Sequence, residues 1–318
     1  MYYIIERSGL VLFCILHIMA SSGREIPITN NQVYQFILAN DGKSGYLLER
    51  DSIEIVKWNE PVNEFRVETL PINTKETLSS LTFAQEGVQG VAPHPEEVAV
   101  IAWSGVSPDR RVERFLTYLA SGQTILLRVP LIILSVAVTP SSQIYVFGII
   151  PGENNLIHEV SLDGAISNSF HHKELSPDVT DLLGNIRLIS YEDSLYYAVL
   201  HTGILFQYNQ SGTLLRTYKF KNIFKEGVSI REVFLGQDGL YLDLLRGKKV
   251  LDGDGGFSMT DPKREFIVLK NGEMRSISID LDIKFRILGL IRNSKLIVKS
   301  TDVSSPGHTS VLDFYNPK

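Results

Sequence analysis

The chain has 318 residues, of which 44% are hydrophobic and 21% are charged, so it is neither a disordered nor a collagen-like polypeptide. It contains 31 Lys and Arg and 36 Asp and Glu residues, and the formal net charge of −5 excludes a general nucleic-acid-binding surface, which needs dense positive charge. A single cysteine excludes both an internal disulfide and a cysteine-cluster metal site.

The first residues have the pattern of a targeting segment. Residues 9–20 form an apolar run as long as the hydrophobic region of a signal peptide and too short to span a bilayer. Ala20 and Ser22 have the small-residue spacing of a cleavage site. We therefore predict a signal peptide over residues 1–22, a single mature domain over 23–318 without a transmembrane span, and a secreted or periplasmic location. An uncleaved anchor is the alternative.

The remaining sequence repeats a unit of four short strands. In its clearest copy, residues 133–170, two strand-like runs flank a Pro-Ser-Ser turn, and two more flank Asp163-Gly164. An Asp-Gly pair between alternating runs is a strong hairpin signal. The predicted units are 33–74, 81–130, 131–170, 184–222, 228–281 and the segment from 285 onward.

The spacing of these units predicts the fold. Turn glycines at 122, 164, 212 and 272 recur at intervals of roughly 40 to 60 residues. A unit of roughly 40–50 residues with four strands is typical of a β-propeller blade. The last unit lacks a fourth strand, and residues 25–29 form a strand-like piece that has no local partner. The sequence therefore predicts an all-β, six-bladed β-propeller whose last blade is closed by the N-terminal strand.

With these repeats, the chain resembles six-bladed propellers of the broad NHL-like and TolB-like kind. The resemblance is carried by the strand–turn–strand units, best seen in 133–164, and extends over about residues 25–316. It implies the fold and no single activity, since such propellers include hydrolases, lyases, oxidoreductases and binding platforms.

Long irregular segments are expected on one face of the propeller, where each inner strand begins. They are residues 104–113, 171–185 and 246–264. Long loops on a rigid scaffold are where binding sites concentrate. We therefore predict that a ligand or partner binds on this face.

Three arginines occupy equivalent positions in successive blades. Arg187, Arg231 and Arg286 each stand near the start of a predicted innermost strand. Such positions are neighbours at one mouth of the axial channel, and like charges there repel unless an anion or carboxylates separate them. The arrangement favours an anionic ligand. The alternative is that each arginine pairs with a neighbouring acid.

The other candidate ligand-binding residues lie close to these arginines in sequence. Glu192 and Glu232 are the nearest acids, and Asn185 belongs to the same strand start. We expect the two carboxylates to lie between the guanidinium groups if no anion does.

No metal site is predicted. Asp252 and Asp254 begin a pattern like that of a calcium loop, but its remaining ligand positions are not filled by oxygen ligands. We expect a flexible acidic turn there, with calcium as the alternative. His171 and His172 are adjacent and point to opposite sides of an extended chain, so we expect surface or loop histidines.

Together these features predict an exported, monomeric, non-enzymatic binding or scaffold propeller without a cofactor. Its expected partner is a protein or a small anionic or carbohydrate ligand, and not nucleic acid. The alternative is a hydrolase or lyase that acts on an anionic or carbohydrate-like substrate at the axial channel mouth.

Overall fold

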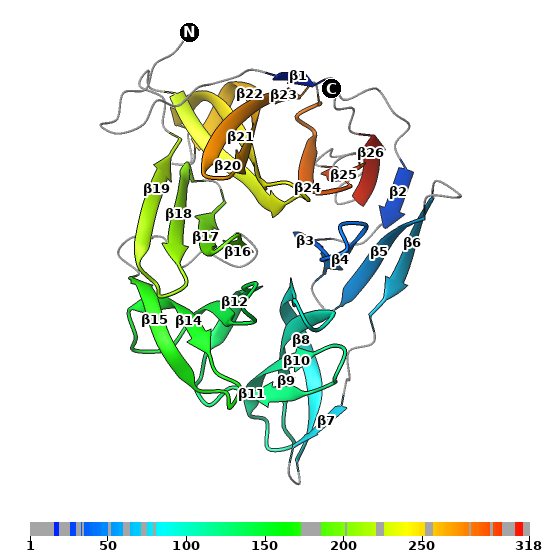
Figure 1. The fold of residues 1–318 in the computed structure, drawn as a ribbon, viewed down its shortest axis with the longest axis vertical. Coiled ribbons are helices and arrows are strands. Elements are labelled where there is room, and N and C mark those ends of the chain that lie inside the picture. Colours follow the sequence, from blue (N-terminus) through cyan, green and yellow to red (C-terminus); the bar gives the residue numbers. More distant parts are fainter. Residues whose placement is uncertain are drawn as a thin grey trace.

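A computed structural model gives the fold. It describes residues 16–18, 26–29, 33, 35–49, 52–59, 64–70, 75–78, 81–172, 186–200, 202–220, 226–251, 257–279, 281–292, 295–300 and 309–313. All regular secondary structure in these ranges is β-strand, and the strands form six sheets around a central axis (Figure 1). The predicted six-bladed β-propeller is confirmed. The described residues contain no helix long and apolar enough to cross a membrane.

Each sheet is one blade, and the first three follow the chain in order. Blade 1 contains β3 (Gln35–Leu38), β4 (Ser44–Leu48), β5 (Ile53–Asn59) and β6 (Glu64–Thr69). Blade 2 contains β7 (Lys75–Leu78), β8 (Leu81–Pro93), β9 (Ala99–Val106), β10 (Val112–Tyr118) and β11 (Thr124–Leu126). Blade 3 contains β12 (Ile132–Val138), β13 (Ile144–Ile149), β14 (Asn155–Val160) and β15 (Ile166–His172).

Blade 4 also follows the chain in order, and blades 5 and 6 each include one strand from the N-terminal segment. Blade 4 contains β16 (Ile186–Tyr191), β17 (Ser194–Val199), β18 (Ile204–Asn209) and β19 (Leu214–Lys219). Blade 5 contains β20 (Glu226–Leu235), β21 (Leu240–Leu251), β22 (Phe257–Lys270), β23 (Glu273–Ile279) and β1 (Leu16–Ile18). Blade 6 contains β24 (Phe285–Ile291), β25 (Lys295–Ser300), β26 (Thr309–Asp313) and β2 (Ile26–Thr29).

The N-terminal strand closes the ring as predicted. β2 pairs antiparallel with β26, so that Ile26 lies opposite Val311 and Thr29 opposite Thr309. This pairing gives blade 6 its fourth strand and covers the edge of β26. The two ends of the chain are thus held together within one sheet.

A second N-terminal strand was not expected from the sequence. β1 pairs in parallel with β23, with Leu16 opposite Ile277 and Ile18 opposite Ile279. It lies within the segment predicted to be a signal peptide, and cleavage after Ser22 would remove it. The signal peptide itself stays a prediction.

Hairpin turns occur where their sequences predicted, and Asn271-Gly272 has the primed conformation, whereas at Asp163-Gly164 only the glycine has positive φ. Gly164 has φ of 80°, and Asn271 and Gly272 both have positive φ, 51° and 74°. Primed two-residue turns need φ > 0, which glycine and asparagine adopt at least cost. The local turn signals therefore identified the blade hairpins correctly.

Hydrophobic clusters lie between neighbouring blades and not at the axis. Each of the six clusters among the described residues draws its side chains from two adjacent blades. Successive residues of an inner strand point to opposite sides, so Leu188 packs towards blade 3 and Ile189 towards blade 5. The inner strands therefore present their edges to the axis, which leaves room there for a cavity.

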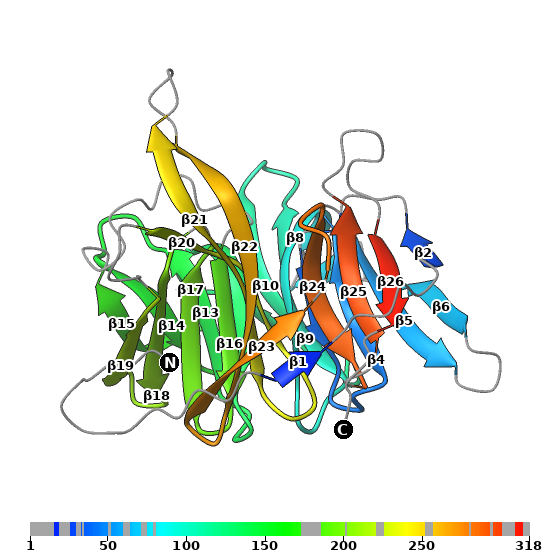
Figure 2. The ribbon, with the colours of Figure 1, turned by 90° about the horizontal axis from the view of Figure 1, so that it is seen from above.

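Two of the segments predicted to be irregular are mainly strand. Within 246–264, β21 continues to Leu251 and β22 starts at Phe257, and the two strands form a long hairpin that projects beyond the other blades (Figure 2). Within 104–113, only residues 107–111 lie outside β9 and β10. Antiparallel pairing extends both hairpins, and the sequence reading missed it because these segments are polar. Most of 171–185 lies outside the described residues.

Candidate functional site

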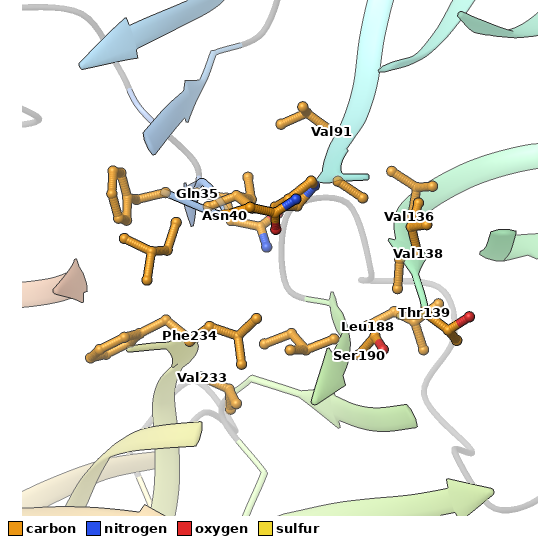
Figure 3. Close-up of a pocket in the computed structure, with 18 of the residues that line it drawn as sticks. Gln35, Asn40, Val91, Val136, Val138, Thr139, Leu188, Ser190, Val233 and Phe234 are labelled. Atoms are coloured by element: carbon orange, nitrogen blue, oxygen red, sulfur yellow. The ribbon is translucent and has the colours of Figure 1, made fainter. Parts of the chain in front are cut away.

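A cavity of about 400 Å³ lies at the axis of the propeller. Its walls come from the inner strands of five blades, β3, β8, β12, β16 and β20, and from turns that follow three of them. Figure 3 shows side chains from all five surrounding the space: Gln35, Asn40, Val91, Val136, Val138, Thr139, Leu188, Ser190, Val233 and Phe234. The size and the mostly apolar lining are those of a pocket for a small molecule.

A few polar groups interrupt the apolar lining. Asn40 donates from Nδ2 to the carbonyl oxygen of His94 at 2.7 Å, which fixes the orientation of its amide. The Ser190 hydroxyl oxygen is buried, and no hydrogen-bond partner for it exists among the described residues. A buried hydroxyl without a partner costs about 1–3 kcal/mol, and a ligand that hydrogen-bonds to it would recover part of this cost.

The cavity lies towards the face opposite to the one predicted. Asn40, Pro95 and Pro140 line it, and they belong to the turns that follow inner strands β3, β8 and β12. The described strands that lead into the segments 104–113, 171–185 and 246–264 (β9, β15 and β21) end at the opposite end of the blades from these turns. The predicted binding face is therefore not the face that bears the axial cavity.

The other end of the inner strands carries a buried ion cluster. Arg187 donates from Nε to Oε1 of Glu232 at 2.5 Å and from Nη2 to Oε2 at 2.8 Å. The Arg187 side chain is 2% exposed and that of Glu232 1%. Arg286 donates from Nη2 to the same Oε2 at 3.1 Å. Glu232 thus lies between two of the predicted arginines, as expected for a carboxylate that separates like charges.

A bulge in β20 places these groups at the inner edge of blade 5. The register with β21 shifts between Ile230 and Glu232, so Arg231 is the extra residue of the bulge. Arg187 of blade 4 and Arg286 of blade 6 both contact Glu232 of blade 5. Glu232 must therefore lie at the inner edge of blade 5, since this is the part of the blade that is close to both neighbouring blades. The next residues of β16 and β20, Leu188 and Val233, already line the cavity. The ion pair therefore lies next to one end of the cavity.

A second buried pair adjoins this cluster. Arg264 donates to both carboxylate oxygens of Asp243, at 3.0 and 3.2 Å, and the two side chains are 3% and 0% exposed. Arg231 donates from Nη1 to the carbonyl oxygens of Ile283 and Phe285, at 3.1 and 3.3 Å. Burial lowers the pKa of Arg231 to about 10, while the Asp243 carboxylate partly opposes this shift.

The remaining predicted site residues do not join the cluster. Glu192 lies at the turn after β16, at the opposite end of this strand from Arg187, and accepts a hydrogen bond from the Asn271 amide at 3.3 Å. The expectation that it separates the arginines is wrong, because a six-residue strand keeps its two ends far apart. Asn185, Asp252 and Asp254 lie outside the described residues, and calcium binding at the last two stays a prediction.

His171 and His172, expected at the surface or in a loop, are the last two residues of β15, where His171 is 3% exposed and His172 is half-buried. His94 and His158 are also buried, at 4% and 0% exposed. His171 contacts the Tyr208 hydroxyl through Nδ1, and burial lowers the pKa of its imidazole to about 4. No three His, Cys, Asp or Glu side chains of the described residues form a group that could hold a metal ion.

Three charged residues near this cluster were not predicted from the sequence. They are Asp243 and Arg264, which pair with one another, and Lys299, whose pKa is lowered by burial and by the charge of Arg286. One signal was available: Asp243 interrupts the apolar run Leu240–Leu245, and an acid inside a buried strand needs a partner. Nothing in the sequence indicated which partner, because Arg264 lies on a different strand. The sequence did not indicate the axial cavity, because most residues that line it have the apolar pattern of ordinary buried strands.

No protein-family model matches this sequence, and no curated protein matches it significantly. Similar solved structures include a putative oxidoreductase (glucose dehydrogenase) from Thermus thermophilus, 12% identical over 92% of this chain and 99% of that chain, with a TM-score of 0.45. Virginiamycin B lyase from Staphylococcus aureus is 10% identical over 92% of this chain and 98% of that chain, with a TM-score of 0.45. Regucalcin, a calcium-binding protein from Agrobacterium tumefaciens, is 11% identical over 96% of this chain and 98% of that chain, with a TM-score of 0.41. The fold assignment of this chain rests on its own sheets.

Proposed function

We propose that this chain is a binding propeller that holds a compact, mainly apolar small molecule in its axial cavity. The observation that supports this most directly is the cavity itself, about 400 Å³ in volume and lined by the inner strands of five blades. Pockets of roughly 300–1,000 Å³ with apolar walls and few polar groups suit small ligands. The Asn40 amide and the Ser190 hydroxyl would orient a ligand that carries one or two polar atoms.

A small ligand fits these observations better than a protein partner does. The large hydrophobic side chains that are exposed among the described residues belong to four different blades, whereas a protein interface needs a continuous apolar centre. They are Val67, Val98, Val112, Leu126, Ile132, Leu162, Leu214 and Leu215. The axial cavity concentrates apolar surface in one place.

The proposal is tested with a neutral naphthylamine fluorophore, whose emission rises in apolar surroundings. We expect saturable binding at one site by the full chain. Ser190→Phe and Val138→Phe place a ring in the cavity and are expected to weaken binding at least tenfold. Ser167→Phe, at an exposed position on β15, is the matched control and should bind as the original chain does.

Two outcomes would overturn the proposal. One is an absence of saturable fluorescence. The other is equal binding by the cavity-filling variants while their circular dichroism shows an intact fold, because the fluorophore would then bind elsewhere.

We also propose that the chain is exported and that cleavage follows Ser22. The support is the apolar run 9–20 with Ala20 and Ser22 after it. The test expresses the full chain and measures the mass of the protein in the exported fraction. A mass that starts at Gly23 is expected, and a full-length protein held in the membrane fraction would contradict cleavage.

A further inference from the structure

Positive charge exceeds negative charge where the inner strands of blades 4, 5 and 6 begin. Among the described residues, five cationic side chains and two carboxylates meet there: Arg187, Arg231, Arg264, Arg286 and Lys299 with Glu232 and Asp243. The pairs Arg187–Glu232 and Arg264–Asp243 account for both carboxylates. Three positive charges remain without a carboxylate of their own.

Of these three cations, Arg286 lies close enough to influence both Arg231 and Lys299. Burial lowers the pKa of the Arg231 guanidinium most, and Arg264 and Arg286 lower it further, while the carboxylates of Asp243 and Glu232 oppose the shift. Burial and the charge of Arg286 lower the pKa of the Lys299 ammonium. Unmatched like charges in a partly buried setting repel, and an anion between them would relieve the repulsion.

One hydrogen-bond donor at the same place is unused. The Nε atom of Arg286 is buried and has no partner among the described residues. Arg231 makes its hydrogen bonds to two backbone carbonyl oxygens, and Lys299 donates to the carbonyl oxygen of Val33 at 3.1 Å. The Arg286 side chain as a whole is 21% exposed, so solvent reaches part of this side chain although its Nε atom is buried.

We propose that Arg231, Arg286 and Lys299 form a binding site for a small oxyanion group, a phosphate or a carboxylate. Guanidinium groups present several N–H donors in one plane, which match the oxygens of such anions. Glu232 holds Arg286 in place through the 3.1 Å contact and thereby orients its free Nε. The site lies at the opposite end of the inner strands from the turns that line the axial cavity, and it does not depend on a ligand in that cavity.

The test is calorimetric titration of the full chain with inorganic phosphate and, separately, with succinate, each at constant ionic strength set by chloride. We expect saturable binding of one equivalent of at least one of the two anions. Phosphate binding alone would indicate a phosphorylated ligand, and succinate binding alone a carboxylate ligand. Arg286→Gln is expected to weaken binding at least tenfold, since a charge-assisted hydrogen bond contributes about 1.5–3 kcal/mol.

A second variant is needed because Arg286→Gln removes a contact with Glu232 and could destabilise the fold. Lys299→Gln leaves both Arg–carboxylate pairs intact and is expected to weaken binding roughly tenfold on the same grounds. Arg275→Gln, at an exposed arginine on β23, is the matched control and should bind as the original chain does. No saturable binding of either anion, or undiminished binding by the folded Lys299→Gln variant, would overturn the proposal.

Discussion

Arg187 and Glu232 are 45 positions apart in the chain and form a two-point ion pair between blades 4 and 5. Both side chains are almost completely buried, and Glu232 also accepts a hydrogen bond from Arg286 of blade 6. One carboxylate therefore joins three consecutive blades at the axis. Removal of one partner from a buried pair leaves the other charge without compensation, which costs more than the pair gains.

Glu232→Gln is therefore expected to lower the free energy of unfolding by about 3–5 kcal/mol, because Arg187 and Arg286 would face a neutral amide. Urea denaturation measures the loss. The control is Glu68→Gln in the exposed pair Lys57–Glu68, whose side chains are 50% and 53% exposed, where a loss below about 1 kcal/mol is expected. Equal small losses in both variants would show that the buried pair is not needed for the stability of the ring.

The lowered pKa of His171 predicts that the free energy of unfolding depends on pH. The pKa of its imidazole is about 4 in the folded protein, against an ordinary value of 6.5. Between these values the unfolded chain binds a proton that the folded protein does not, so stability falls as pH falls from 6.5 towards 4. The contribution is about 3 kcal/mol in total.

The measurement compares urea denaturation of the original chain and His171→Asn between pH 7 and pH 4. Asparagine does not titrate and tolerates the φ of 62° at this position. The variant should lose less stability over this range than the original chain. His158 also has a lowered pKa through burial, so some acid sensitivity remains in both. An identical decrease in the two proteins would contradict the assignment to His171.

Gly289 makes room for the ring of Phe36 between blades 6 and 1. A Cβ at Gly289 would overlap the Phe36 ring, and Phe36 is 2% exposed and lines the axial cavity. Gly289→Ala should therefore cost about 1–3 kcal/mol of stability. The double variant Gly289→Ala with Phe36→Leu should lose less than the sum of the two single losses, because the smaller side chain relieves the overlap. Additive losses would indicate that the two residues do not interact.

Closure by the N-terminal strand predicts a difference between two truncated chains. A chain that begins at Gly23 keeps β2 and should unfold at nearly the temperature of the full chain. A chain that begins at Asn31 lacks β2, leaves the edge of β26 unpaired, and should lose about 2–3 kcal/mol, or roughly 5–10 °C in Tm. Calorimetry measures both. Equal melting temperatures would contradict the closure, and a large loss in the Gly23 chain would give β1 a stabilising role.

The sequence by itself determined the blades of this protein. Strand runs, hairpin turns such as Asn271-Gly272 and the missing fourth strand of the last unit were sufficient for the six-bladed ring and its closure. These signals are local, because a turn depends on two or three residues and a strand pattern on alternation along a few residues. The repeat also indicated that Arg187 and Arg286 lie near one another, and both contact Glu232, since equivalent positions in adjacent blades are close together.

Only the tertiary structure decided which groups meet. Glu232 separates two arginines although it is 45 positions from Arg187 in the chain. Glu192 is much closer to Arg187 in sequence but lies at the far end of the strand, because bulges and strand direction determine where a side chain points. Arg264 of β22 pairs with Asp243 of β21. The polar segment 246–264, predicted to be a loop, forms the outer part of the β21–β22 hairpin. The axial cavity arises from five inner strands that are distant in the chain, so its volume and lining depend on how the blades pack, which no local pattern records.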